Sequence, residues 1–180
     1  MKIEPNVPDQ AETDRLIRGE IVIDLAFLPD DVTGIKAKIF VAAPPEAVWG
    51  ALTDYDNLSR TLPKVVASSV TERSGSTVIL DQIGKTGIFF FEKTVTFSLS
   101  VREERLKRIL FEQISGDFER YRGSWQLFAL PDHKGTILVY EAEIKPAFFA
   151  PALLVSFVQR QDLPGILKAH KRTAETALKL

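Results

Sequence analysis

The 180-residue chain contains no cysteine, so disulfide bonds, thiolate nucleophiles and cysteine-ligated metals are excluded. Its two histidines, His133 and His170, lack further ligands or triad partners at a recognisable spacing. We therefore predict no metal, no cofactor and no catalytic residue. The formal net charge is only -1, so no general field attracts nucleic acid.

Long apolar runs are also absent. No segment approaches the roughly 20 apolar residues that span a bilayer. The first residues, MKIEPNVPDQAETDR, contain no apolar stretch typical of a secretory signal. We expect a cytoplasmic protein, with peripheral contact at a membrane as a further possibility that depends on the C-terminal region.

Composition favours one globular domain, with 45% hydrophobic and 26% charged residues. Residues 1–18 contain proline, acidic and amide residues without periodicity, so we expect a flexible N-terminal tail. Residues 19–180 then form a single ligand-binding domain.

Alternating apolar and polar residues dominate the middle of the chain. Strands are expected over 20–27 and 34–41, and the paired prolines at 44 and 45 end the second of them. Helical spacing around Trp49 predicts a short helix, and a second short helical turn follows residues 54–57. Further strands are expected near 65–72, 76–85, 88–101, 106–115, 119–130 and 135–144.

The chain is predicted to end in helix, from Pro151 to about Gln161 and again from Leu163 onward. Asp162 is a good N-cap residue and Pro164 suits a first turn, so we expect a break between the two parts. This order predicts an α+β fold, with a curved antiparallel sheet wrapped around the long C-terminal helix. The two short helices would close one end, and an apolar gap between helix and sheet is typical of a small-molecule site.

Two motifs resemble a known superfamily. They are APPEAVWGALTDY at 43–55, followed by Leu62-Pro63, and GDFERYRGSWQL at 116–127 with GTILVY at 135–140. Both are similar to the START-like (SRPBCC, helix-grip) superfamily of polyketide cyclase/dehydrase and lipid-transport proteins. The resemblance runs from about residue 35 to 180, and the strand from residue 20 resembles an extension in cyanobacterial and plastid members. It implies a helix-grip fold, shared by lipid carriers, coenzyme-Q-binding proteins, aromatase/cyclases and ribosome-associating proteins.

Candidate ligand-binding residues are those that alternation places on inner strand faces, together with apolar residues near the start of the terminal helix. They are Phe89, Phe91, Lys93, Phe97, Phe111, Gln113, Tyr121, Trp125, Tyr140, Phe148, Phe149, Leu154 and Phe157.

Several of these residues have two interpretations. Lys93 and Gln113 either contact a polar group of the ligand or lie at a bulge or an exposed strand end. Trp49 and Trp125 favour core packing, with cavity contact as the alternative. His170, next to Lys168 and Lys171, is interpreted as a residue of the exposed helix face.

The uncharged segment 146–158 is either a buried helix start or a gate whose phenylalanines touch a bilayer. The charged clusters at 102–108 and 168–172 lack interleaved aromatic residues, so no nucleic-acid partner is expected. We expect the protein to bind a hydrophobic small molecule, such as a lipid or isoprenoid quinone. If it is a carrier, it also transports this molecule. The alternatives are a polyketide aromatase/cyclase and a module that binds a protein partner. The sequence does not indicate the oligomeric state.

Overall fold

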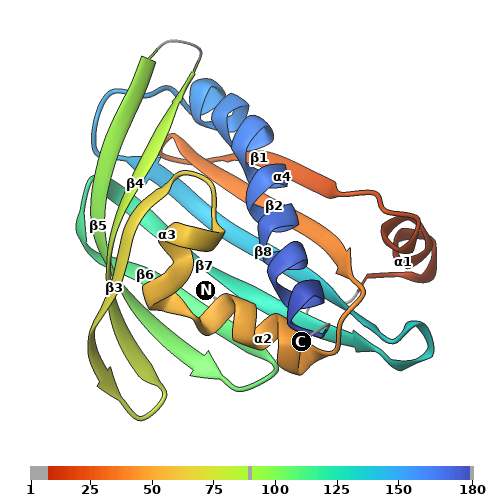
Figure 1. Ribbon diagram of the computed structural model, residues 1–180. Helices are drawn as coiled ribbons and strands as arrows, with labels where there is room; N and C mark the ends of the chain where they lie inside the picture. Colours follow the sequence, from red (N-terminus) through yellow and green to blue (C-terminus); the bar gives the residue numbers. More distant parts are fainter. Residues whose placement is uncertain (1–7, 89–90, 179–180) are drawn as a thin grey trace.

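An eight-stranded antiparallel sheet curves around one long helix in the computed structural model, which describes residues 8–88 and 91–178 (Figure 1). The strand order across the sheet is β1-β2-β8-β7-β6-β5-β4-β3. The strands are β1 (Val22–Leu28), β2 (Val32–Val41), β3 (Val65–Ser74), β4 (Thr77–Ile88), β5 (Phe91–Glu104), β6 (Arg108–Gly116), β7 (Phe118–Leu130) and β8 (Gly135–Pro146).

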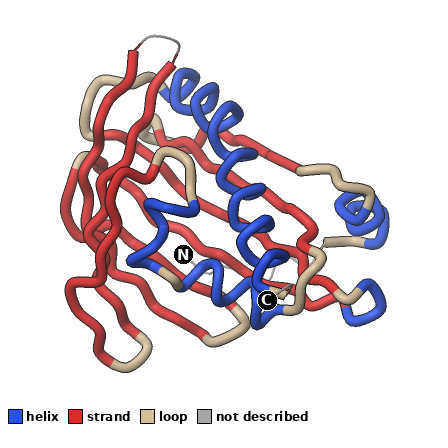
Figure 2. The backbone as a smooth tube through the Cα atoms, viewed as in Figure 1, coloured by secondary structure: helices blue, strands red, loops and turns tan. Residues whose placement is uncertain are grey.

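The chain also forms helical segments, most of which lie on the concave side of the sheet (Figure 2). They are α1 (Gln10–Ile17), α2 (Pro45–Thr53), η1 (Tyr55–Asn57), α3 (Leu58–Thr61), η2 (Pro131–His133) and α4 (Ala152–Ala177). Helix α4 crosses the concave face, while α2, η1 and α3 lie beside it (Figure 1). The predicted α+β helix-grip architecture is confirmed, including the two short helices after the first strands.

The core lies between α4 and the concave face, as the alternation predicted. Ile35, Ala37 and Ile39 of β2 are buried there, and Lys36 points to the opposite face. Trp49 of α2 is also buried, with 7% of its surface exposed, and α2 packs against α4. The prolines at the start of α2, Pro44 and Pro45, therefore direct a short apolar helix onto the end of the core.

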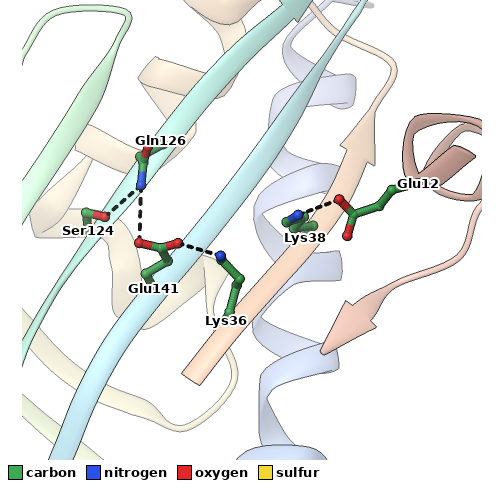
Figure 3. Close-up of polar contacts among 6 residues, drawn as sticks. All are labelled: Glu12, Lys36, Lys38, Ser124, Gln126 and Glu141. Carbon is green, nitrogen blue, oxygen red and sulfur yellow. Dashed lines mark hydrogen bonds and ion pairs between the residues drawn. The ribbon is translucent and has the colours of Figure 1, made fainter. Parts of the chain in front are cut away.

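Helix α1 corrects the expectation of a tail through residue 18. Asp9 caps it by accepting a hydrogen bond from the Glu12 backbone N–H at 2.8 Å, and Leu16 is fully buried on the convex face. Glu12 also forms an ion pair with Lys38, only 4% of which is exposed (Figure 3). Tertiary contacts stabilise this helix, whereas local periodicity does not reveal it.

The convex face beside α1 carries a second polar network (Figure 3). The Gln126 amide donates to Ser124 at 3.3 Å and to Glu141 at 3.5 Å. Lys36 forms an ion pair with Glu141 at 3.3 Å. These bonds satisfy polar groups on the opposite side of the sheet from the core.

Helix α4 is continuous, so the predicted break near Asp162 is wrong. Pro164 lies inside the helix and leaves the Arg160 carbonyl without its usual backbone donor. Arg160 is exposed, so that carbonyl can bond water, and burial of Leu163 and Leu167 offsets the cost of the proline. Among the described residues, no helix combines the length and apolar character needed to cross a membrane.

Candidate ligand-binding site

A cavity of about 890 Å³ lies between α4 and the concave face of the sheet. This volume falls within the roughly 300–1,000 Å³ typical of small-molecule sites. Its interior is lined by buried residues such as Leu99, Ile109 and Leu163. Exposed lining residues, including Lys64, Lys93 and Phe149, mark its opening between the β4–β5 hairpin, the start of β3 and the first turns of α4.

One wall of the cavity is a continuous series of aromatic rings from β5, β6, β7, β8 and α4. Neighbouring ring centroids lie between 4.5 and 6.1 Å apart in the series Phe118, Phe97, Tyr121, Phe111, Tyr140, Trp125 and His170. Gly123 is needed in this wall, since a Cβ there would lie 2.0 Å from the backbone oxygen of Glu141 and 2.8 Å from the Phe111 ring. Such a surface favours flat or apolar ligands.

Two tyrosines belong to this wall, Tyr140 buried and Tyr121 partly buried. Burial raises the pKa values of Tyr121 and Tyr140, and a hydrogen bond joins the two hydroxyl groups. Both side chains therefore stay neutral at physiological pH, and Tyr140 donates its hydroxyl proton to the Tyr121 oxygen.

His170 is the buried titratable group at the inner end of the cavity. Only 4% of its surface is exposed, and burial lowers the pKa of its imidazole from 6.5 to about 4. A hydrogen bond with the backbone of Ala51 in α2 offsets part of this shift. The imidazole is therefore neutral at physiological pH, and its predicted position on an exposed helix face is wrong.

The cavity mouth carries the charged groups. The Lys93 ammonium lies 4.1 Å from the centroid of the Phe148 ring, a cation–π contact. Lys64 lies 3.9 Å from Asp162 of α4, and burial raises the pKa of that carboxyl group. The strand register near Lys93 is regular, so the lysine points to the cavity side while its end remains exposed.

The structure brings most of the predicted site residues to one cavity. Those on its wall are Lys93, Phe97, Phe111, Tyr121, Trp125, Tyr140, Phe148, Phe149 and Leu154. Phe89 lies outside the described residues, and Phe91 is described only by its backbone pairing with Ile88 in the β4–β5 hairpin.

Gln113 and Phe157 do not line the cavity. The Gln113 amide turns away to donate to the Phe118 carbonyl at 2.7 Å, bridging β6 and β7. Phe157 is 48% exposed, because its position on α4 faces away from the cavity wall. Alternation and composition alone reveal neither the hydrogen bond of Gln113 nor the outward position of Phe157.

Sequence reasoning missed the cavity residues of α2, η1 and the second half of α4. Leu52, Tyr55, Leu163 and His170 all line the cavity. Tyr55 donates a hydrogen bond to Glu103 at 3.0 Å, which closes the end of the cavity beside β5. The helical spacing from Leu163 to His170 was the available signal for the last two. Among the described residues, no group of three or more potential metal ligands is found.

The family model for polyketide cyclase/dehydrase and lipid transport proteins matches residues 41–171, well over half of the chain. The chain belongs to this family. The START-like resemblance of the two motifs is thereby confirmed, while the likeness to cyanobacterial and plastid members remains a prediction. The match covers α2, most of the sheet and α4 as far as Lys171, and so includes every element that lines the cavity.

Several solved structures share the fold of this family member, although their sequence identity to it is low. The Zhui aromatase/cyclase from Streptomyces sp. R1128 is 16% identical, with a TM-score of 0.71 over 82% of this chain and 96% of that chain. A STAR-related lipid transfer protein from Xanthomonas axonopodis is 14% identical, with a TM-score of 0.63 over 85% and 98%. Human STARD10 is 13% identical, with a TM-score of 0.63 over 99% and 84%. No curated protein sequence matches the chain.

Proposed function

We propose that the protein binds a hydrophobic small molecule, such as a lipid or isoprenoid quinone, non-covalently in the cavity beneath α4. The observation that carries this proposal is the cavity of about 890 Å³ with its aromatic wall. Burial of apolar ligand surface contributes roughly 25 cal/mol per Å², and a few polar groups orient the ligand. Solved relatives of the same fold include a lipid transfer protein, which is consistent with this role.

An aromatase/cyclase reaction is the alternative, because a solved neighbour carries that name. Such a reaction needs a group that accepts a proton near neutral pH. The pKa of His170, about 4, makes the imidazole a weak base under those conditions. Tyr121 and Tyr140 hold their protons more firmly than free tyrosine, because burial raises both pKa values. The aromatic wall and His170 therefore offer no strong base near neutral pH, which favours binding without turnover.

Native mass spectrometry of protein purified from its own source tests this proposal. We expect a bound apolar compound that survives purification and is released by organic solvent. Protein whose cavity is empty while a protein partner co-purifies would instead support the partner-binding alternative. A bound polyketone that leaves as a cyclised product would support the enzyme.

We also propose that the cavity mouth contacts a membrane when the ligand enters or leaves. Phe149, in the connection before α4, is 95% exposed, and Leu153, in the first turn of α4, is 73% exposed; both lie beside the opening. Full burial of each such side chain contributes about 1.5–3 kcal/mol. Lys93, at the same opening, can approach anionic headgroups. Weak, reversible membrane binding is expected from so few groups.

The variant Phe149→Ser with Leu153→Ser is expected to weaken binding to phosphatidylcholine–phosphatidylglycerol vesicles by at least about tenfold. Both side chains are exposed, so the melting temperature should hold. Leu178→Ser, an exposed position at the far end of α4, is the matched control. Co-sedimentation measures the effect. Equal binding by wild type and the double variant would show that this surface is no membrane contact.

A further inference from the structure

One buried acceptor in the cavity wall has no partner. Among the described residues, three buried side-chain atoms lack a hydrogen bond: Oε1 of Gln113, Oγ of Ser156 and Nδ1 of His170. Of these three atoms, only Nδ1 of His170 belongs to a residue that lines the cavity. A buried polar atom left unsatisfied is costly, so a ligand group that bonds it gains affinity and direction.

The tautomer of His170 follows from its surroundings. Nδ1 has no partner, so the hydrogen bond with the Ala51 backbone involves the other ring nitrogen. That bond favours the protonated imidazole, so the ring donates to the Ala51 carbonyl. Nε2 therefore carries the proton, and Nδ1 is left with a lone pair that can only accept.

The surroundings of this acceptor restrict what can reach it. Trp125 packs edge-on against the imidazole with centroids 5.1 Å apart, and the Tyr140 hydroxyl already donates its proton to Tyr121. A carboxylate has no proton to donate, and an ammonium group would lose its hydration among apolar side chains. A neutral hydroxyl group meets both requirements.

We infer that the inner end of the cavity takes the hydroxyl group of a neutral amphiphile, an alcohol or phenol, which donates a hydrogen bond to Nδ1 of His170. This inference rests on the proposed function and specifies its ligand class. Nδ1 exposes less than 1 Å² in this structure, so the side chains that cover it must shift when the hydroxyl enters. The apolar remainder extends along the aromatic wall toward the mouth. Within the isoprenoid class, the site then favours a quinol or alcohol over a quinone or ester.

Two isomeric probes test the inference on the wild-type protein. 1-Dodecanol donates a hydrogen bond, whereas methyl undecyl ether has the same formula and no donor. Displacement of N-phenyl-1-naphthylamine fluorescence should show the alcohol binding about tenfold more tightly, the scale of one hydrogen bond to an unsatisfied buried acceptor. Equal affinities would overturn the inference while leaving the proposed cavity function standing. Binding of neither isomer would overturn both, and tighter binding of laurate would indicate an anionic headgroup instead.

Nitrogen NMR locates the hydroxyl directly. The chain has only two histidines, and His133 lies in an exposed turn, so its signals are an internal reference. Dodecanol should move the Nδ1 resonance of His170 to lower frequency, as hydrogen bonding to an unprotonated ring nitrogen does, and the ether should not. Saturation with dodecanol and an unmoved Nδ1 signal would contradict the assignment.

A pair of variants on α4 gives the matched comparison. His170→Phe removes the acceptor and should bring the affinities for the two isomers within about twofold of each other. Ser156→Ala removes another unpartnered buried polar atom of the same helix, outside the cavity, and should preserve the tenfold preference. Retention of the preference in His170→Phe would refute the inference. The nitrogen NMR result decides the question if that variant does not fold.

Discussion

Replacement of Trp49 by alanine is expected to lower the free energy of unfolding by about 3–5 kcal/mol, the usual cost of truncating a buried aromatic side chain. Trp49 is almost fully buried where α2 packs against α4, so its removal leaves a void at the closed end of the fold. Ligand retention should fall as well, because Leu52 of the same helix lines the cavity.

Urea denaturation measures this change, with Phe149→Ala as the matched control. Phe149 is an aromatic residue that is almost fully exposed, so its truncation should change stability by about 0.5 kcal/mol or less. A Trp49→Ala protein that melts within about two degrees of wild type would show that α2 does not close the core.

The strands were predictable because one side of the sheet faces the core. Tyr121 and Trp125 on β7 lie four residues apart and both reach the cavity, as period-two alternation requires. The same rule placed Lys93 on the cavity side of β5, since its pairing with β4 contains no register shift there. Alternation alone could not show that the Lys93 ammonium remains exposed against Phe148, which comes from a distant part of the chain.

Helix α1 was missed because its stability comes from elsewhere in the fold. Leu16 is its only fully buried apolar residue, and it packs against Ile137 and Val139 of β8. A helix this short needs such contacts, and local sequence does not record them. Glu12 and Lys38 likewise become partners only once β2 and α1 are brought together.

The helix break predicted at Pro164 was wrong because a local signal was overridden by tertiary packing. Asp-Leu-Pro is typical of a helix start, yet the chain continues the helix because Leu163 and Leu167 both pack into the core. His170 lies one turn further along the same apolar stripe. Its basic neighbours Lys168 and Lys171 favoured an exposed position, whereas the helical period, which was the better guide, places it inward.

The burial of His170 should make stability depend on pH. The imidazole pKa is lowered from 6.5 to about 4 in the folded protein, so between these values the unfolded chain binds a proton that the folded protein does not. Stability from this residue is therefore fully present above pH 6.5 and is lost as the pH falls toward 4. The loss between pH 7 and pH 4 amounts to about 3 kcal/mol.

Urea denaturation at pH 7 and pH 4 on wild type, His170→Gln and His133→Gln isolates this effect. His133 lies in an exposed turn, so its variant should keep the wild-type loss, including the part contributed by carboxylates. His170→Gln should lose less stability than wild type over this range, by about 3 kcal/mol, because glutamine takes up no proton. Equal losses in all three proteins would mean that the folded protein protonates His170 as readily as the unfolded chain does. A neutral, accepting Nδ1 at the inner end of the cavity would then not exist below pH 6.5.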